Sequence, residues 1–230
     1  MKIVRVLAVP TLVALAACSS SGSEQDKGVE GEGVGAAASA PDVNPDGVPY
    51  PTDNIGTLPR SGARKGNRLE NFKFLGYPNA DMSQGLQPIS MAQFFDPEGK
   101  KYKIIRLVAS ASWCPPCQGE AELVAGMKSE LEEKKVLWLT SLSEGPTSGP
   151  STKKDLDNWI KEFKGWNTHW LDPSNKNLGP FYDRAAIPWN ATVNAQTMEI
   201  LESKTGAPGG KEDLLKELDD LIAKSGGAKY

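Results

Sequence analysis

Cysteine and histidine are scarce in this chain, whose 230 residues include three cysteines and one histidine. A structural zinc site needs four ligands, which are mostly cysteine and histidine. Cys18 belongs to an N-terminal leader motif, which leaves only Cys114, Cys117 and His169. We therefore expect no metal site. His169 lies inside a predicted strand, and we expect its role to be structural.

An excess of basic residues is also absent. The chain has 26 Lys and Arg residues against 29 Asp and Glu residues, for a formal net charge of −3. Binding to a phosphate backbone or to anionic lipid headgroups needs a concentrated cationic surface, and no basic stripe is present. We expect no nucleic-acid partner, so contact with a membrane would have to come from a lipid anchor.

The N-terminal apolar run, residues 6–14, is too short to cross a bilayer as a helix. It follows Lys2 and Arg5 and precedes Leu15-Ala16-Ala17-Cys18, an order typical of a signal peptide over residues 1–17. Small residues before a cysteine resemble the bacterial lipobox, whose cysteine is acylated. Each buried methylene contributes about 0.8 kcal/mol, so several acyl chains on Cys18 would anchor the protein stably. An ordinary signal peptide with a chance cysteine is the alternative.

Residues 18–65 have the composition of a tether. Gly, Ser, Ala and acidic residues dominate as far as Gly47, and Pro49, Pro51 and Pro59 follow. Such a segment buries too little apolar surface to offset its ordering entropy. We predict a disordered and then extended tether with a mean span of about 40 Å. Residues 66–230 are predicted to form the folded domain.

Strand and helix patterns alternate through that domain, which predicts an α/β fold. The strands are predicted at residues 69–75, 102–110, 136–142, 168–171, 190–194 and 199–203. The helices are predicted at residues 89–95, 117–134, 155–163, 178–184 and 211–224. The last two strands are adjacent in the sequence, so we expect a closing antiparallel hairpin followed by a C-terminal helix.

Cys114 and Cys117 follow a buried strand and open a long helix. Free N–H groups at a helix N-terminus favour a thiolate, so we expect a lowered pKa for Cys114. Cys117 lies one turn further and can attack a mixed disulfide formed at Cys114. Pro115 and Pro116 are tolerated because first-turn N–H groups lack intrahelical partners. A Cys-x-x-Cys pair in this setting indicates redox chemistry. A structural disulfide is disfavoured because so short a loop constrains little, whereas an inactive pair remains an alternative.

Several further landmarks accompany the cysteine pair in a fixed order. They are Asn71-Phe72-Lys73-Phe74, Trp113-Cys114-Pro115-Pro116-Cys117, Glu120, Leu171-Asp172-Pro173 and Ile187-Pro188. With these landmarks, residues 69–224 resemble the TlpA/ResA group of extracytoplasmic thioredoxin-like proteins. The resemblance implies a thioredoxin-like fold, with a central mixed sheet flanked by helices.

The resemblance also implies roles for individual residues. Cys114 is the nucleophile and Cys117 the resolving thiol, and no cofactor beyond their redox-active disulfide is expected. Pro188 would be cis, with an ordinary turn proline as the alternative. The substrate chain would dock on the backbone of Ile187, and Trp113 is a further candidate for substrate binding.

Glu120 would be tied to the active site, where a carboxylate raises thiol pKa values and relays protons. The alternative for Glu120 is a solvated acid in the first helical turn.

Two of the sequence's departures from the family concern the candidate site. Thioredoxins carry a buried acid six residues before the first cysteine, where this chain has Val108. Trp189 follows Pro188, where small or β-branched residues are usual, so Trp189 would either narrow a substrate groove or simply pack.

The expected function is a thiol-disulfide oxidoreductase, first of all a reductase, of which cytochrome c maturation enzymes are one type. An oxidase or an isomerase, which uses the same chemistry at a different potential, is an alternative. Its partners would be disulfide-containing exported proteins and a membrane thiol-disulfide electron donor. The expected location is the bacterial cell envelope, lipid-anchored on the periplasmic face of the inner or outer membrane.

A copper-handling thioredoxin-like metallochaperone using His169 is one alternative, and a lipid-anchored binding protein with an inactive pair is another. The peroxiredoxin motif Pro-x-x-x-Thr/Ser-x-x-Cys ends at neither Cys114 nor Cys117.

Overall fold

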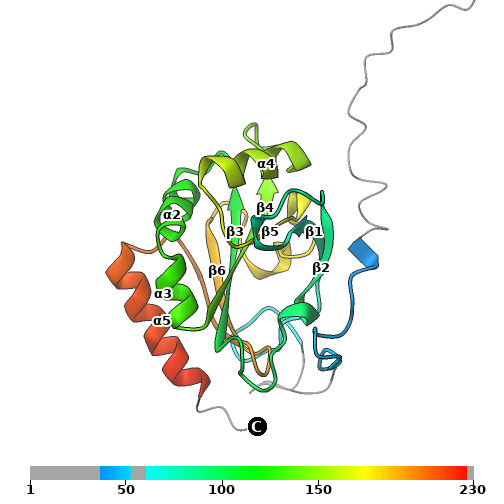
Figure 1. Cartoon of the computed structure of the whole chain (residues 1–230). Helices are drawn as coiled ribbons and strands as arrows, with labels where there is room; N and C mark the ends of the chain where they lie inside the picture. The colour runs from blue at the N-terminus through cyan, green and yellow to red at the C-terminus, as the bar shows by residue number, and fades with distance from the viewer. Residues whose placement is uncertain (1–36, 53–60, 227–230) are drawn as a thin grey trace, which may run out of the picture.

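A computed structural model describes residues 37–52 and 61–226 of the chain (Figure 1). Within these ranges, seven strands form one mixed sheet in the order β2-β1-β5-β4-β3-β6-β7. The strands are β1 (Lys73–Tyr77), β2 (Gln87–Ser90), β3 (Ile104–Ala111), β4 (Val136–Glu144), β5 (Thr168–Leu171), β6 (Trp189–Asn194) and β7 (Ile200–Thr205). The helices are α2 (Pro115–Ala125), α3 (Lys128–Glu133), α4 (Lys153–Glu162) and α5 (Lys211–Ser225). The predicted α/β class, with its closing antiparallel hairpin and C-terminal helix, is confirmed.

The α-helices pack against one face of the sheet. Val108 of β3 and Trp138 of β4 share an apolar cluster with side chains of α2, α3 and α5. On the same face, α4 packs beside the cysteine pair and against Leu171 of β5. The opposite face, to which Leu107 of β3 belongs, is covered by the 3-10 turn η2 (Met91–Phe94) and by Tyr50.

The central strand β3 leads directly into the helix that carries the cysteines. It pairs parallel with β4 and antiparallel with β6, and all eight of its side chains are buried. At its end the amide of Ser112 donates to the carbonyl of Glu144 at 2.9 Å, and the amide of Cys114 donates to the carbonyl of Ala111 at 3.1 Å. This tight connection holds the N-terminus of α2 at the carboxyl ends of two parallel strands.

The helix predicted over residues 117–134 is interrupted. Gly126 forms the C-cap of α2, and glycine is common where helices end. Met127 then has non-helical angles (φ −114°, ψ 14°) before α3 begins. Met127 and Leu131 are nevertheless buried in the same cluster. The apolar spacing therefore continues across the break, which is why it predicted a single helix.

The edge strand β2 is not predicted by the sequence pattern. It is short, contains Pro88 and, among the described residues, pairs with β1 alone, as expected of a proline-bearing edge strand. The helix predicted at residues 89–95 is the 3-10 turn η2. The helix predicted at 178–184 is likewise a 3-10 turn, η4 (Gly179–Phe181), and the strand predicted from residue 69 begins at Lys73.

Residues 37–52, which we call the N-terminal strap, are packed against the domain. The Nδ2 group of Asn44 donates to the carbonyl of Phe95 at 3.0 Å, and the Tyr50 hydroxyl donates to the carbonyl of Leu69 at 2.5 Å. The carbonyl of Pro41 accepts a bond from the Ser90 hydroxyl at 2.6 Å. The prediction of a tether throughout residues 18–65 is therefore wrong for the strap, because a few side chains in a polar segment are enough to dock it.

The predicted signal peptide and Cys18 lie outside the described residues, so they stay predictions. Across residues 37–52 and 61–226, no helix is both long enough and apolar enough to cross a membrane.

The packing of the strap predicts a measurable stability effect. Tyr50 is buried and packs edge-on against Phe95, with ring centroids 6.0 Å apart. We expect Tyr50→Ala to lower the free energy of unfolding by about 3 kcal/mol, since truncating a core aromatic leaves a cavity. Urea denaturation measures this, with Val48→Ala as the control because Val48 is exposed. Equal and small effects for both variants would mean that the strap is loose.

Candidate active site

Cys114 and Cys117 form a disulfide at the N-terminus of α2, with Cα atoms 5.3 Å apart. Cys114 is the N-cap residue, and its Sγ accepts a hydrogen bond from the backbone N–H of Cys117 at 3.2 Å. Pro115 occupies the first turn, as predicted. After reduction, the same N–H and the helix dipole would stabilise a thiolate on Cys114. The local geometry therefore suits Cys114 as the nucleophile and Cys117 as the thiol behind it.

Ile187 and Pro188 immediately precede β6, the strand that pairs antiparallel with β3, and Ile187 packs against the cluster that contains both cysteines. The Ile187–Pro188 peptide bond is cis, as predicted. The carbonyl oxygen of Ile187 is 3.8 Å from Cys114 Sγ, so the backbone before β6 borders the reactive sulfur. This segment can present backbone groups to a chain that approaches Cys114.

Trp189 does not line the mouth of the site. Its indole is buried in the core, stacks on Tyr182 with ring centroids 5.2 Å apart, and donates from Nε1 to the Ser203 hydroxyl at 3.0 Å. Of the two readings of Trp189, the structure shows packing. The prediction that Trp189 binds the substrate is therefore wrong. Its position on β6 turns the ring into the apolar cluster on the face of the sheet to which Leu107 belongs.

Trp113 is the large apolar side chain exposed beside the disulfide, with 39% of its surface accessible. Its Nε1 donates to Glu144 Oε2 at 2.8 Å, and Arg184 binds the other oxygen of Glu144 at 2.6 Å. Glu144 ends β4, and Arg184 precedes the Ile187 segment. Glu144 therefore fixes the indole at the site entrance, a role that sequence reasoning missed because its partners are distant in the chain.

Glu120 is buried beneath the cysteine pair, with 3% of its surface accessible. The Nδ2 group of Asn190 donates to its Oε2 at 3.3 Å. Burial raises the pKa of Glu120 to about 7, and the nearby charge of Arg106 opposes that rise. The reading of Glu120 as a solvated first-turn acid is wrong, because this side of α2 faces β3 and β6.

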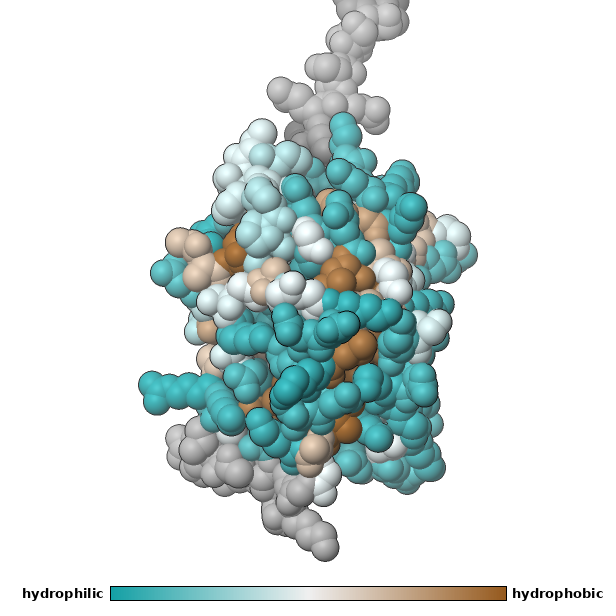
Figure 2. Space-filling model, turned by 90° about the vertical axis from the view of Figure 1, so that its left-hand side faces the viewer, coloured by the Kyte–Doolittle hydropathy of each residue, from teal (hydrophilic) through white to brown (hydrophobic). Residues whose placement is uncertain are grey.

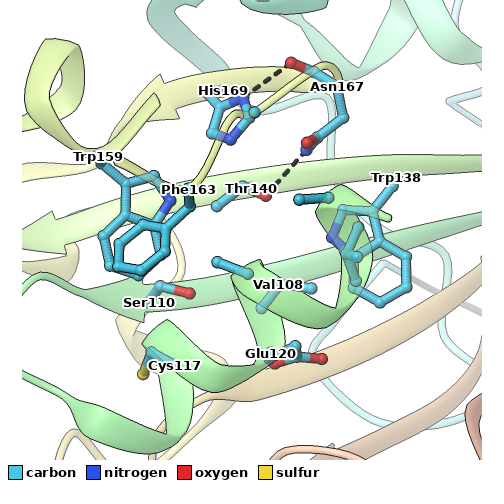
Figure 3. A pocket seen from close by; sticks show the side chains of 14 residues that line it. Val108, Ser110, Cys117, Glu120, Trp138, Thr140, Trp159, Phe163, Asn167 and His169 are labelled. Atoms are coloured by element: carbon cyan, nitrogen blue, oxygen red, sulfur yellow. Dashed lines mark hydrogen bonds between the residues drawn. The ribbon is translucent and has the colours of Figure 1, made fainter. Parts of the chain in front are cut away.

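A small internal cavity lies between α2 and the sheet (Figure 3). Cys117 and Glu120 line it from α2, Val108 and Ser110 from β3, and His169 from β5. Its volume of about 20 Å³ corresponds to one water molecule. Val108 stands where thioredoxins have a buried acid. Here the acid reaches the same cavity from the helix instead.

His169 lies across that cavity in a buried, neutral form. Its Nδ1 is 2.7 Å from the carbonyl oxygen of Asn167, to which it donates (Figure 3). Burial lowers the pKa of His169 to about 4. A Cβ atom on Gly165 would lie 2.6 Å from His169 Cε1, so the ring is tightly enclosed. Among the described residues, no group of three or more His, Cys, Asp or Glu side chains is placed to hold a metal ion.

Comparison with known proteins identifies the fold but no sequence family. No protein-family model and no curated protein matches the sequence. The chain is similar to a structure assigned as thiol:disulfide interchange protein DsbE from Chlorobium tepidum, with a TM-score of 0.52 and 14% identity over 72% of this chain and 100% of the other. It is also similar to the thioredoxin domain of a thiol-disulfide oxidoreductase from Bacteroides vulgatus, with a TM-score of 0.52 and 13% identity over 70% and 99% of the two chains. A 2-Cys peroxiredoxin from Plasmodium vivax matches with a TM-score of 0.52 and 13% identity over 70% and 98%. These similarities confirm the predicted thioredoxin-like fold.

The raised pKa of Glu120 predicts how stability depends on pH. In the unfolded chain Glu120 has the ordinary glutamate pKa of 4.5, whereas in the folded protein its pKa is about 7. As the pH rises, the unfolded chain therefore loses this proton first. The folded state then binds more protons, so ionisation of Glu120 lowers the free energy of unfolding as pH rises through this interval. Glu120→Gln should be more stable than the wild type by up to about 3 kcal/mol near pH 8, and this advantage should vanish near pH 4.

Urea denaturation at both pH values measures this difference. Glu122→Gln is the matched control, since Glu122 is an exposed acid on the same helix. A pH-independent difference between Glu120→Gln and the wild type would contradict the assignment of the raised pKa to Glu120.

Proposed function

We propose that this protein is a thiol-disulfide oxidoreductase that reduces disulfides in exported proteins. The observation that carries the proposal is the Cys114–Cys117 disulfide at the N-terminus of α2, with the Ile187 carbonyl oxygen 3.8 Å from Cys114 Sγ. A thiolate placed at a helix N-terminus is stabilised and can serve as nucleophile or leaving group. The thioredoxin-like fold supports the same chemistry.

The reaction begins with the reduced protein. The Cys114 thiolate attacks one sulfur of a client disulfide, which forms a Cys114–client disulfide and releases the other client sulfur as a thiolate. Cys117 then loses its proton and attacks Cys114 Sγ. This step forms the Cys114–Cys117 disulfide and releases the second client thiolate. The client gains two electrons, and a membrane thiol-disulfide donor returns two electrons to the cysteine pair.

Glu120 is the group proposed to receive the proton from Cys117. Both residues line the cavity beneath the pair, and Figure 3 shows them on the same helix, α2. A pKa of about 7 lets Glu120 accept a proton near neutral pH and give it up again. A carboxyl with its ordinary pKa would remain ionised and would hold such a proton poorly.

Trp113 and Ile187 form the proposed contact surface for the client. The exposed indole gives an apolar platform beside the disulfide, and Glu144 holds its orientation. The carbonyl oxygen of Ile187 lies 3.8 Å from Cys114 Sγ. A client segment that contacts both Trp113 and Ile187 would bring its sulfur to Cys114 through backbone and apolar contacts that depend little on its sequence.

The finer part of the proposal concerns location and type. The lipobox-like sequence ending at Cys18 supports lipid anchoring at an extracytoplasmic membrane face, and the landmark residues support a TlpA/ResA-type reductase. The copper-handling alternative needs His169 as a ligand. However, its Nδ1 is committed to the Asn167 carbonyl, and the ring is buried.

The roles of the two cysteines are tested by trapping. With insulin as the disulfide substrate, reduced Cys117→Ser should accumulate a mixed disulfide through Cys114 that dithiothreitol releases. Cys114→Ser should trap far less, because Cys117 lies inside the helix and faces the cavity. Both variants should lose catalysed insulin reduction. Non-reducing gels and intact mass spectrometry measure the adduct. A wild-type protein that neither accelerates reduction nor exchanges with any dithiol would instead be a binding protein with an inactive pair.

A further inference from the structure

Arg106 is a cation in the interior of the sheet. It lies on the central strand β3, with 1% of its side chain accessible. Its guanidinium carbon is 5.9 Å from the centre of the Trp138 ring, and its Nη2 forms an ion pair with Glu217 of α5. Its Nε and Nη1 have no hydrogen-bond partner within residues 37–52 and 61–226. Burying a charge whose N–H donors lack acceptors costs free energy. An arginine at this position therefore indicates a role that an apolar residue could not perform.

Glu217 links this buried cation to the surface. One carboxylate oxygen pairs with Arg106 and the other with Lys204 of β7. The side-chain accessibilities rise from 1% for Arg106 to 21% for Glu217 and 37% for Lys204. Although burial acts to raise the pKa of Glu217, the two cations outweigh it and hold that pKa below its usual value. Glu217 therefore stays charged, and three alternating charges lead from the solvent into the protein.

The outer end of this series lies on the helical side of the molecule. In Figure 1, α5 runs beside α2 and α3, and Figure 2 shows that the surface on this side is mostly hydrophilic. A solvent-exposed hollow of about 270 Å³ between β7 and α5 is lined by Lys204 and Glu217. Both residues can therefore be substituted at a solvent-exposed surface that neither cysteine lines.

The inner end of the series lies beside the cavity that Glu120 lines, because the Arg106 guanidinium lies over the Trp138 ring and Trp138 lines the same cavity as Glu120. Glu120 Oε1 has no hydrogen-bond partner among the described residues. Glu120 Oε2 accepts a hydrogen bond from Asn190 Nδ2, which also donates to the Gly206 carbonyl at 3.3 Å. After burial, the charge of Arg106 is the strongest influence on the pKa of Glu120 and lowers it. Glu217 raises that pKa and Lys204 lowers it. Cys117 and the neutral His169 are the titratable groups that share the cavity with Glu120.

We propose that Arg106, Glu217 and Lys204 form an electrostatic relay that sets the charge of Glu120 from the β7–α5 surface. The charge of Arg106 acts through space on the Glu120 carboxyl, Glu217 partly neutralises Arg106, and Lys204 partly neutralises Glu217. The three are positioning residues and do not touch the reacting sulfurs. The consequence for catalysis rests on the proposed function, whereas the effect on Glu120 does not.

The relay predicts shifts of opposite sign, which a general loss of structure would not produce. Removing a positive charge disfavours the carboxylate form, so Arg106→Met should raise the pKa of Glu120 by about one unit or more. Lys204→Met should raise it by less, because Lys204 is further from Glu120 along the series. Glu217→Gln should lower it, since an unneutralised Arg106 favours the carboxylate.

Glu120 is titrated by carbon-13 NMR of the glutamate carboxyl groups in the oxidised full chain, with Glu120→Gln identifying its signal. Asp220→Asn is the matched control, because Asp220 is an exposed acid on α5 that pairs with Lys216. This control should leave the Glu120 titration unchanged. If Arg106→Met fails to fold, the two surface variants still decide the outcome. Shifts of the same sign for Glu217→Gln and Lys204→Met, or no shift in either, would overturn the relay.

Insulin reduction across a range of pH gives the catalytic readout of the same variants. The pH midpoint of the rate should move up in Lys204→Met and down in Glu217→Gln, following the NMR titration. Opposite NMR shifts in a protein that reduces no disulfide would support the relay and remove the proposed function alone.

Discussion

The immediate passage from β3 into α2 is the constraint on which the rest of the site depends. Because only Ser112, Trp113 and Cys114 separate the buried strand from the helix, the first turn of α2 lies against the carboxyl ends of β3 and β4. That placement buries both sulfurs and gives Cys114 a backbone donor. It also sets one side of α2 against the sheet, so that the acid three residues after Cys117 enters the interior.

The buried acid of this site therefore comes from the helix α2, and not from the position on β3 where thioredoxins carry one. Val108 makes the strand apolar at that point, and Glu120 reaches the same cavity from α2. A lone carboxyl in this position would be held neutral by burial. Arg106 offsets that effect, and Glu217 limits the offset. Desolvation and charge together leave a group that changes protonation near neutral pH, as the exchange of a thiol proton requires.

Local features were predicted from the sequence and distant ones were not. The cysteine pair at a helix start follows from a short motif, and β3 follows from its branched apolar residues. The cis bond at Pro188 was implied by the family resemblance. The ion pair of Arg106 with Glu217 joins residues 111 positions apart, and no local pattern marks such a pair. The docking of the N-terminal strap was missed for another reason. Average composition describes a polar segment well, but it hides a single buried side chain such as Tyr50.

Catalysis by this site requires that Cys114 and Cys117 interconvert reversibly between a dithiol and a disulfide. Equilibration in thiol-disulfide buffers of graded potential tests it most directly, with tryptophan fluorescence reporting Trp113 and mass spectrometry counting free thiols. We expect one reversible two-electron transition at about −220 mV or below, in the range of glutaredoxins and thioredoxin. Absence of a reversible two-thiol transition would contradict the account.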